Sequence, residues 1–278
     1  MRSRQAVIVD EITEDGVVER DLGGEVPCSV NPFLIEADVR SLVGLPLMVK
    51  DRLLGVLYLH SLQPNAFQGQ LFLLTAFANQ VAVAIENARL FQNEQRQARR
   101  LALLADVARI GATNLNADSL LQKVAESIRY HFEYPMVGLF TLDEEQQMLD
   151  LRGYSGISVG STNVITPGVY RQTVELGICG YVTRTGRSHL TNDVSSDPYF
   201  LNPGEVPIRS ALYVPLLDDD RVVGTIGLES DQPRSFSEED QSLLEAVADT
   251  VATGLRNAHL HQEAQRHVQE LTILNRIS

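Results

Sequence analysis

From residue 99 onward the chain has apolar residues at helical spacing. In RRLALLADVARIGATNLNADSLLQKVAESIRYHF (99–132) they lie at Leu101, Leu104, Val107 and Ala108, and then at Leu120, Leu121, Val124 and Ile128. This spacing is typical of amphipathic helices. Gly111 and the NLNADS segment predict a break between two helices, with Asn116 or Asp118 as the cap of the second.

Short apolar runs further along the chain predict strands. Each run alternates apolar with polar residues, or is bounded by turn residues. The predicted strands are MVGLFTL (136–142), MLDLRGY (148–154), HLTNDV (189–194), ALYVPLL (211–217) and VVGTIGLE (222–229). DDDR between the last two predicts a hairpin turn with acceptor side chains.

Two more helices accompany these strands. GICGYVTRTG (177–186) predicts a short amphipathic helix that ends at Gly186. A long helix begins near Ser237, which stands three residues before Asp240 in a sequence close to a capping box. The order of helices and strand pairs favours an antiparallel sheet with helices packed on it, an α+β architecture.

Part of this pattern occurs twice. VRSLVGLPLMVKDRLLGVLYLHSLQPNAF (39–67) corresponds to IRSALYVPLLDDDRVVGTIGLESDQPRSF (208–236) at an offset of 169 residues, and the following helix continues at an offset of 170. So many matches in one register indicate a tandem repeat. RQAVIVD (4–10) resembles the strand that precedes the loop of the second copy, with Asp10 opposite Asp193.

The first copy contains only the later elements of the pattern and lacks the first helices and the first strand pair. LTILNRIS (271–278) resembles the opening helix of another copy. We therefore expect a partial domain over 1–95 and a complete domain over 96–262. Over 263–278 we expect a linker helix or the start of a further repeat. The chain is expected to be either a window on a longer protein or the product of an open reading frame truncated at both ends, and a frayed tail is the alternative for its last residues.

The segments that link the domains are polar, with sparse apolar positions and no proline. In the last of them the apolar residues are Leu260, Ala264, Val268, Leu271 and Leu274. That spacing suits a helix that is marginal alone and stable beside a partner, as in a parallel coiled coil. We expect long helical linkers and a homodimer formed through them.

Charge and hydropathy exclude several classes of partner. A formal net charge of −13 argues against binding to nucleic acid or to an anionic membrane. Asn79 and Gln80 interrupt the best membrane-span candidate, LFLLTAFANQVAVAI (71–85), which predicts a packed helix instead. Acidic residues follow the N-terminus too closely for a signal peptide. We expect a cytoplasmic protein without a membrane span.

Candidate catalytic chemistry is sparse. Cys28 and Cys179 form no CxxC pair and have no nearby histidine, so we expect neither a metal site nor a disulfide-built fold. His267 is followed by Val-Gln rather than by the acidic residue typical of a kinase phospho-acceptor box. The sequence offers no nucleophile combined with an acid–base pair, so we assign no catalytic residue.

Three stretches of the second copy resemble a GAF domain, the small-molecule sensor module of bacterial signalling proteins. They are GICGYVTRTGRSHLTNDVSSDPYF, RSALYVPLLDDDRVVGTIGLES and FSEEDQSLLEAVADTVATGLRNAHL. RSLVGLPLMVKDRLLGVLYLHS and FANQVAVAIENARL of the first copy resemble the same family. The resemblance implies a GAF-like (PAS-related) α+β fold with a six-stranded antiparallel sheet. It also implies a ligand pocket on one face, under a loop and a short helix, and helices on the other face that often form a dimer bundle.

A pocket of this kind is mostly apolar with a few polar groups. Its candidate ligand-binding residues in the second copy are Tyr181, Asn192, Asp193, Tyr199, Phe200, Arg209 and Ser210. Arg209 could pair with a carboxylate or a phosphate. The alternative is that Asp193 and Arg209 only tie the loop to the sheet, because Asp10 and Arg40 recur in the partial copy.

The identity of the ligand or cofactor is not readable from the sequence. GAF domains that bind cyclic nucleotides tend to carry an Asn-Lys pair followed by F-x-x-x-D-E. This chain has Glu229-Ser230, then Phe236 and Asp240, and lacks the lysine. Neither cysteine is placed as for a bilin chromophore. His189 is the one histidine in the expected pocket region, which does not by itself mark a haem ligand.

The sequence thus predicts a non-catalytic, small-molecule-sensing module that passes its ligand state through helices to an output domain outside this chain, such as a histidine kinase or a nucleotide cyclase. A structural dimerisation module without a ligand is the second reading. The third is a Cys-dependent enzyme like the GAF-related group that reduces free methionine sulfoxide. That group uses several cysteines in one domain, whereas each copy here has one.

Overall fold

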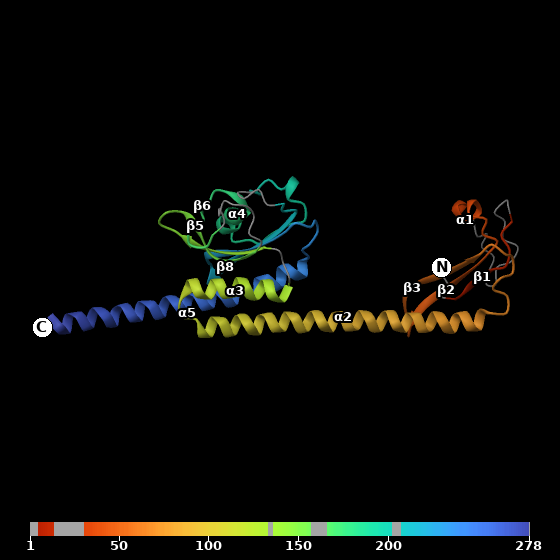
Figure 1. Cartoon of the computed structure of the whole chain (residues 1–278), viewed down its shortest axis with the longest axis horizontal. Coiled ribbons are helices and arrows are strands. Elements are labelled where there is room, and N and C mark those ends of the chain that lie inside the picture. The colour runs from red at the N-terminus through yellow and green to blue at the C-terminus, as the bar shows by residue number, and fades with distance from the viewer. Residues whose placement is uncertain (1–4, 14–30, 133–135, 157–165, 202–206, 278) are drawn as a thin grey trace. The chain divides into compact units, whose positions relative to one another are not determined.

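The computed structural model describes residues 5–13, 31–132, 136–156, 166–201 and 207–277, with side chains up to residue 270. The chain divides into two compact units, Met1–Gln95 and Arg96–Ser278. Each unit places helices against an antiparallel sheet (Figure 1).

The smaller unit is a three-stranded antiparallel sheet in the order β1-β2-β3. Its elements are β1 (Val7–Val9), helix α1 (Pro32–Glu36), β2 (Ser41–Val49), β3 (Arg52–Ser61) and the first part of helix α2 (Leu71–Thr113). On one face of the sheet, Ala78 and Ala82 of α2 are buried against Val43 and Leu45 of β2. This packing gives the unit its apolar core.

The larger unit contains a six-stranded sheet in the order β6-β5-β4-β9-β8-β7, and every neighbouring pair is antiparallel. The strands are β4 (Met136–Asp143), β5 (Met148–Gly156), β6 (Arg171–Thr173), β7 (His189–Thr191), β8 (Ser210–Asp218) and β9 (Arg221–Ser230). The expected α+β antiparallel fold is confirmed. The strand β7 is shorter than predicted because Asp193 caps a 3₁₀ turn, η1 (Val194–Ser196).

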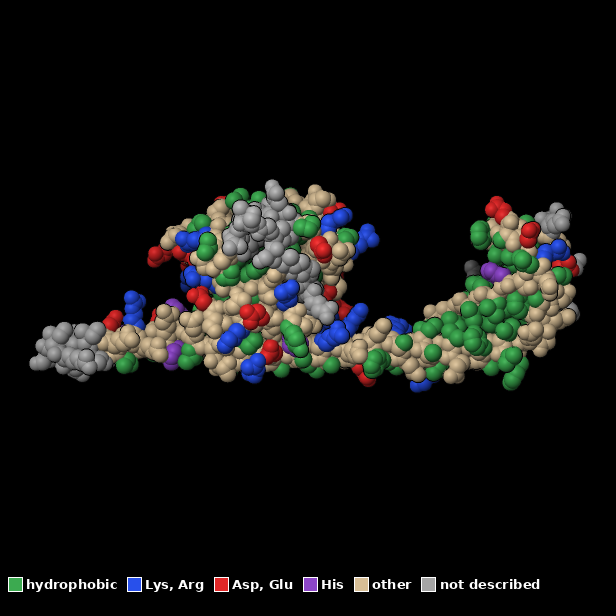
Figure 2. All heavy atoms as spheres, viewed as in Figure 1, with side chains coloured by type: hydrophobic (Ala, Val, Ile, Leu, Met, Phe, Trp, Pro, Cys, Tyr) green, Lys and Arg blue, Asp and Glu red, His purple; other side chains and the backbone are tan. Residues whose placement is uncertain are grey.

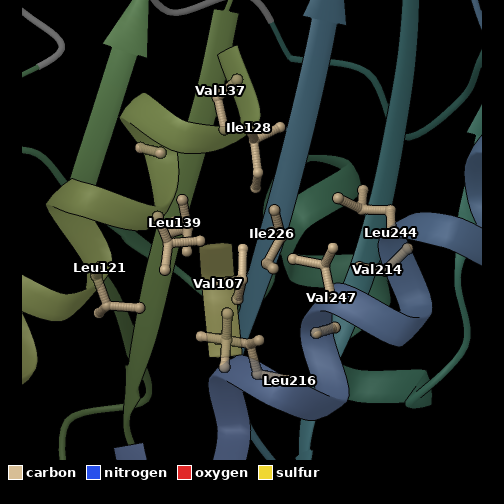
Figure 3. Close-up of a cluster of buried hydrophobic side chains, with 14 of the residues drawn as sticks. Val107, Leu121, Ile128, Val137, Leu139, Val214, Leu216, Ile226, Leu244 and Val247 are labelled. Atoms are coloured by element: carbon tan, nitrogen blue, oxygen red, sulfur yellow. The ribbon is translucent and has the colours of Figure 1, made fainter. Parts of the chain in front are cut away.

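Helices α3 (Ala117–Phe132) and α5 (Glu238–Ile277) cover one face of this sheet, and buried residues of the second part of α2 join the same apolar cluster. In Figure 3, Val107 of α2, Ile128 of α3 and Val247 of α5 meet Leu139 and Ile226 of the sheet. Removal of these apolar side chains from water is the main favourable contribution to the stability of the unit.

The other face of the sheet carries helix α4 (Gly177–Thr185), which packs on β8 and β9. Ile178 and Val182 of α4 are buried in one apolar cluster with Ala211 of β8. The helix ends, as predicted, at Gly186, which adopts a left-handed conformation with φ of 63° and donates its N–H to Val182 O.

Polar caps set the starts of the other two helices, as predicted. At α3, Asn116 Oδ1 accepts a hydrogen bond from Ser119 N over 2.9 Å. At α5, Asp240 Oδ2 accepts from Ser237 N over 2.9 Å, and Ser237 Oγ accepts from Asp240 N over 3.2 Å. This reciprocal pair is a capping box. A cap of this kind stabilises a helix by about 1 kcal/mol.

The predicted break at Gly111 is wrong, because α2 continues through it to Thr113. Gly111 instead lies opposite Gly254 of α5, where a β-carbon on Gly254 would lie only 3.3 Å from Gly111 Cα. The pair of glycines therefore serves helix packing. The chain leaves the helix only at the NLNADS segment.

The predicted core face of α2 is also partly wrong. Leu101 is 68% exposed, and Ala108 is exposed as well. The buried residues of this part of the helix are Leu103, Val107 and Ile110. They lie three to four positions apart, so the helical period was right, but the phase of the stripe differs from the prediction.

The expected long helical linkers are confirmed. Helix α2 has 43 residues and α5 has 40. The helix α5 runs unbroken through the polar segment to Ile277. That this segment opens a further repeat stays a prediction.

Candidate functional site

Three predicted ligand-binding residues meet on the sheet face that carries α4. The rings of Tyr181 and Tyr199 stack with centroids 4.2 Å apart, and Phe200 packs near Tyr181 on the apolar cluster beneath. His189 lies edge-on to both tyrosines, at 5.3 and 5.8 Å. Its Nε2 is 2.7 Å from Oδ2 of Asp197, a side chain only 6% exposed. An aromatic cluster and a His–Asp contact therefore hold the loop that follows β7.

Asn192 and Asp193 fix the backbone of the same loop. Asn192 Nδ2 donates to Phe236 O over 3.1 Å, and Asn192 O accepts from Arg234 N over 3.2 Å. Asp193 Oδ1 accepts from Ser195 Oγ over 2.6 Å and from Ser195 N over 3.1 Å. These hydrogen bonds from Ser195 hold the pKa of Asp193 below its usual value. Both side chains thus have local partners.

Ser210 is fully buried at the start of β8, and its Oγ donates to Gln232 O over 2.7 Å. The smaller unit repeats this contact. Ser41 is also fully buried, and its Oγ donates to Gln63 O over 2.7 Å. Because both units have the same bond, it belongs to the framework that they share.

The strand pairing corrects one part of the repeat alignment. The strands β1 and β2 pair in the same register as β7 and β8. In that register Asp10 corresponds to Asn192, and Glu11, rather than Asp10, corresponds to Asp193. The backbone agrees, since Asp10 O accepts from Asn65 N over 2.7 Å just as Asn192 O accepts from the corresponding residue of the larger unit.

The corrected register places an acid opposite an arginine in both units. In the smaller unit, Arg40 and Glu11 form an ion pair with an N–O distance of 3.0 Å. In the larger unit, Arg209 is exposed, and its charge adds to the effect of Ser195 in lowering the Asp193 pKa. A recurring acid–arginine arrangement supports the alternative that these residues tie the loop to the sheet.

The sheet face under α4 carries further polar side chains, which are not among the seven predicted ligand-binding residues. The Tyr213 hydroxyl of β8 donates to Glu229 Oε1 of β9 over 2.7 Å. Gly227 stands opposite Tyr213, and a β-carbon there would overlap the tyrosine ring. Cys179 Sγ of α4 lies 2.8 Å from Thr225 Oγ1 of β9. Two strands and a helix thus bring a carboxyl group, hydroxyl groups and a thiol together.

Burial shifts the pKa values in this cluster toward the neutral forms. It raises the pKa of Glu229, and the hydrogen bond from Tyr213 opposes that shift. Burial, followed by the charge of Glu229, raises the Tyr213 pKa well above its usual value. Burial is also the main cause that raises the pKa values of Tyr170 and Cys179 to about 12. At neutral pH the cluster offers protonated donors around one carboxyl group.

The smaller unit does not repeat this cluster. Gly44 of β2 pairs with Tyr58 of β3, the reverse of the pairing of Tyr213 with Gly227. A histidine, His60, stands where the larger unit has its glutamate. The sequence signal for the cluster was the set of strand positions at which the two copies differ, such as His60 in one and Glu229 in the other.

Within the part of the chain that the structure describes, no group of three or more His, Cys, Asp and Glu side chains could hold a metal ion. Cys28 lies outside the described residues. Cys179 is buried, and with a pKa raised to about 12 its thiol stays protonated at neutral pH.

By length and composition, helix α2 could cross a membrane. Its apolar first part also packs on the sheet of the smaller unit through Ala78 and Ala82. On other sides of the helix, Phe72 is 88% exposed and Phe77 is 57% exposed. The expectation that the chain has no membrane span therefore stays a prediction.

Comparison with solved structures finds the same fold in proteins of low sequence identity. The GAF domain of a phosphoenolpyruvate-protein phosphotransferase from Coxiella burnetii is 17% identical, with a TM-score of 0.54 over 60% of this chain and 98% of that one. The corresponding domain from Acinetobacter is 19% identical, with a TM-score of 0.51 over 59% and 97%. A free methionine-R-sulfoxide reductase from Neisseria meningitidis, in complex with its substrate, is 20% identical, with a TM-score of 0.52 over 58% and 91%.

Family comparison covers both units. The GAF domain family matches residues 114–256, which hold the six-stranded sheet, and residues 1–85, which hold the three-stranded sheet. The first match alone spans more than half of the chain. The chain therefore belongs to the GAF domain family, with two GAF segments in tandem.

Proposed function

We propose that the larger unit senses a small molecule on the sheet face under α4 and passes its occupancy through helices α2 and α5. GAF domains are regulatory modules that often bind small ligands. The observation that carries the proposal is the Tyr213–Glu229 pair with its neighbours, which the smaller unit does not repeat. Polar groups gathered on an otherwise apolar face are what a small-molecule site needs for orientation and specificity.

The seven predicted ligand-binding residues enter this proposal in different roles. Tyr181, Tyr199 and Phe200 offer aromatic surface beside the polar cluster. Arg209 offers an exposed guanidinium group at the edge of the same face. Asn192, Asp193 and Ser210 hold the loop in place through their hydrogen bonds.

Glu229→Gln is the sharpest test of the polar cluster. The change keeps an acceptor oxygen for Tyr213 and removes the negative charge. Hydrogen bonds to charged groups contribute about 1.5–3 kcal/mol, so we expect occupancy by the co-purified molecule to fall about tenfold. Native mass spectrometry of the freshly purified full chain measures this occupancy.

Tyr130→Phe is the matched control, because Tyr130 is 82% exposed on α3 and lies outside the cluster. It should leave occupancy unchanged. A mass that never exceeds that of the bare chain would instead favour the second reading, a dimerisation module without ligand. Equal loss of the bound molecule in both variants would mean that Glu229 does not contribute specifically to binding.

The dimer belongs to the same proposal. On α5, Leu260 is 56% exposed and Val268 is 62% exposed, as a helix that meets a second copy requires. In Figure 2, apolar side chains gather over α2 and the sheet of the smaller unit, where Phe72 and Phe77 are exposed. Exposed apolar surface of this kind commonly marks an interaction site.

We expect Leu260→Cys to form a disulfide-linked dimer under mild oxidation, in a background where Cys28 is replaced by serine. Position 260 lies on the apolar stripe of α5, so two copies would bring the thiols together. Arg266→Cys is the control, because at 100° per residue it lies on the opposite side of the helix from Leu260 and Val268. Non-reducing electrophoresis separates the outcomes. Equal cross-linking at both positions would argue against a specific helix pair.

The third reading, a methionine sulfoxide reductase, is supported by the fold that this chain shares with the free methionine-R-sulfoxide reductase from Neisseria meningitidis. The chemistry needs a thiolate, whereas burial keeps Cys179 protonated. If the chain reduced free methionine sulfoxide and Cys179→Ser abolished that activity, the reductase reading would be supported. The output domain, whether a histidine kinase or a nucleotide cyclase, and the cytoplasmic location remain parts of our proposal.

A further inference from the structure

A second candidate site lies on the helix side of the larger unit, away from the face that carries α4. It is a cleft of about 670 Å³. Three segments line it: Arg96, Arg99 and Arg100 of α2, His131 and Phe132 at the end of α3, and the segment 234–240 that leads into α5. A volume of this size falls within the range of small-molecule sites.

The charges in the cleft are not balanced. Arg100 forms an ion pair with Glu239 at 2.9 Å. Among the described residues, no carboxylate lies within ion-pair distance, 4.0 Å, of the guanidinium groups of Arg96, Arg99 or Arg234. Asp240 is engaged in the capping box of α5. Among the described lining residues, Glu238 is then the one acid left to set against Arg96, Arg99 and Arg234, so these residues together carry a net positive charge in a strongly acidic protein.

The arginines on α2 are not required by the helix. Arg96, Arg99 and Arg100 stand three and four positions apart, where like charges destabilise a helix by about 0.2–0.5 kcal/mol per pair. At the offset of 170 residues, α5 keeps Arg266 but has Gln269 and Glu270 instead of the other two. The repeat thus shows a helix of the same kind without the concentrated charge.

Arg234 is also held at a conformational cost. Its φ is 57°, in the left-handed region. The smaller unit has the same turn with Asn65 at φ 58°. Asparagine adopts this conformation far more readily than arginine does. The larger unit therefore retains a strained arginine at a point where it lines the cleft.

We infer that the cleft binds a small molecule that carries a diphosphate group. Guanidinium groups match phosphate oxygens with paired hydrogen bonds, and several arginines around one cleft favour a ligand with more than one negative charge. Arg96 and Arg99 approach from α2, and Arg234 approaches from the turn before α5. A bound diphosphate would link the helix that enters the unit to the helix that leaves it. This site shares no residue with the proposed sensor face and goes beyond the function proposed above.

Isothermal titration of the full chain with inorganic pyrophosphate tests the inference. We expect saturable binding that weakens as salt is raised, because the contacts are between exposed charges. Arg99→Ala and Arg234→Asn should each weaken binding about tenfold, as expected when a charge-assisted contact is lost. Arg234→Asn installs the residue found at the corresponding turn, so the fold should tolerate it. Circular dichroism and thermal unfolding verify that it does.

Arg187→Ala is the control, since Arg187 is an exposed arginine of the same unit that does not line the cleft. Its pyrophosphate affinity should equal that of the unchanged chain. A titration with adenosine diphosphate then separates the sources. Tighter binding than pyrophosphate identifies a nucleotide, and equal binding identifies the diphosphate alone. No saturable binding of either compound, or equal loss in Arg187→Ala and Arg99→Ala, would overturn the inference. Neither result bears on the ligand proposed to bind at Glu229.

Discussion

Gly224→Ala is expected to lower the free energy of unfolding of the larger unit by about 3 kcal/mol, while Gly55→Ala is tolerated in the smaller unit. The two glycines occupy the same position of the repeat, in β9 and β3. A β-carbon on Gly224 would overlap the carbonyl oxygen of Phe140 in β4. On Gly55 it would meet only Leu47 Cδ1, at 3.9 Å.

The sheet order explains the difference. The strand β9 lies between β4 and β8, and Gly224 pairs with Thr141 of β4. Among the described strands of the smaller unit, β3 is an edge with a neighbour on one side only. Backbone atoms of a neighbouring strand cannot move aside as a flexible side chain can, so the first substitution must distort the sheet.

Chemical denaturation of the full chain measures the total loss of stability. Hydrogen exchange read by mass spectrometry then assigns the loss to a unit, because exchange should rise in β4 and β9 for Gly224→Ala. The peptides of β2 and β3 should keep their protection in both variants. Equal destabilisation by the two substitutions would mean that β4 does not lie beside β9.

Leu103→Asp is expected to destabilise the larger unit by more than about 4 kcal/mol, and Leu101→Asp by less than about 0.5 kcal/mol. The two leucines lie two positions apart on α2. Leu103 is 1% exposed within the main core, and Leu101 is 68% exposed. A carboxylate at position 103 would lose its hydration without gaining a partner, whereas one at position 101 would stay in water.

Thermal unfolding followed by circular dichroism compares these two variants, which exchange the same residue types on the same helix. We expect Leu103→Asp to lose the cooperative transition of the larger unit and Leu101→Asp to keep it. The reverse order would restore the core face that the sequence suggested. It would also contradict the burial of Leu103 in the apolar core of this unit.

Much of the fold could be predicted because its signals are local. The strand pairs, the cap at Asn116, the capping box at Ser237 and the helix end at Gly186 each depend on residues close together in the chain. The phase of α2 could not be read in the same way. Leu101 and Leu103 are equally apolar, and only the packing against the sheet and α5 decides which one is buried.

The candidate sites show the same difference between local signals and contacts of residues distant in the chain. Tyr181 and Tyr199 could be named as candidates because aromatic residues in a loop and a short helix suggest a pocket lid, and the structure stacks their rings. Tyr213 and Glu229 were missed because their contact crosses two strands and depends on register. The arginine cleft was missed for a similar reason, since Arg99 and Arg234 are far apart in the chain and meet only through helix packing.

The exchange of tyrosine and glycine between the two sheets has a consequence for how such domains diverge. Tyr58 pairs with Gly44, and Tyr213 pairs with Gly227, so each strand pair carries one ring and one position without a side chain. Moving the ring to the adjacent strand conserves the volume but displaces the phenol by about 4.8 Å. A duplicated domain can therefore acquire a new recognition chemistry by a reciprocal swap of two residues, without remodelling the scaffold that carries them.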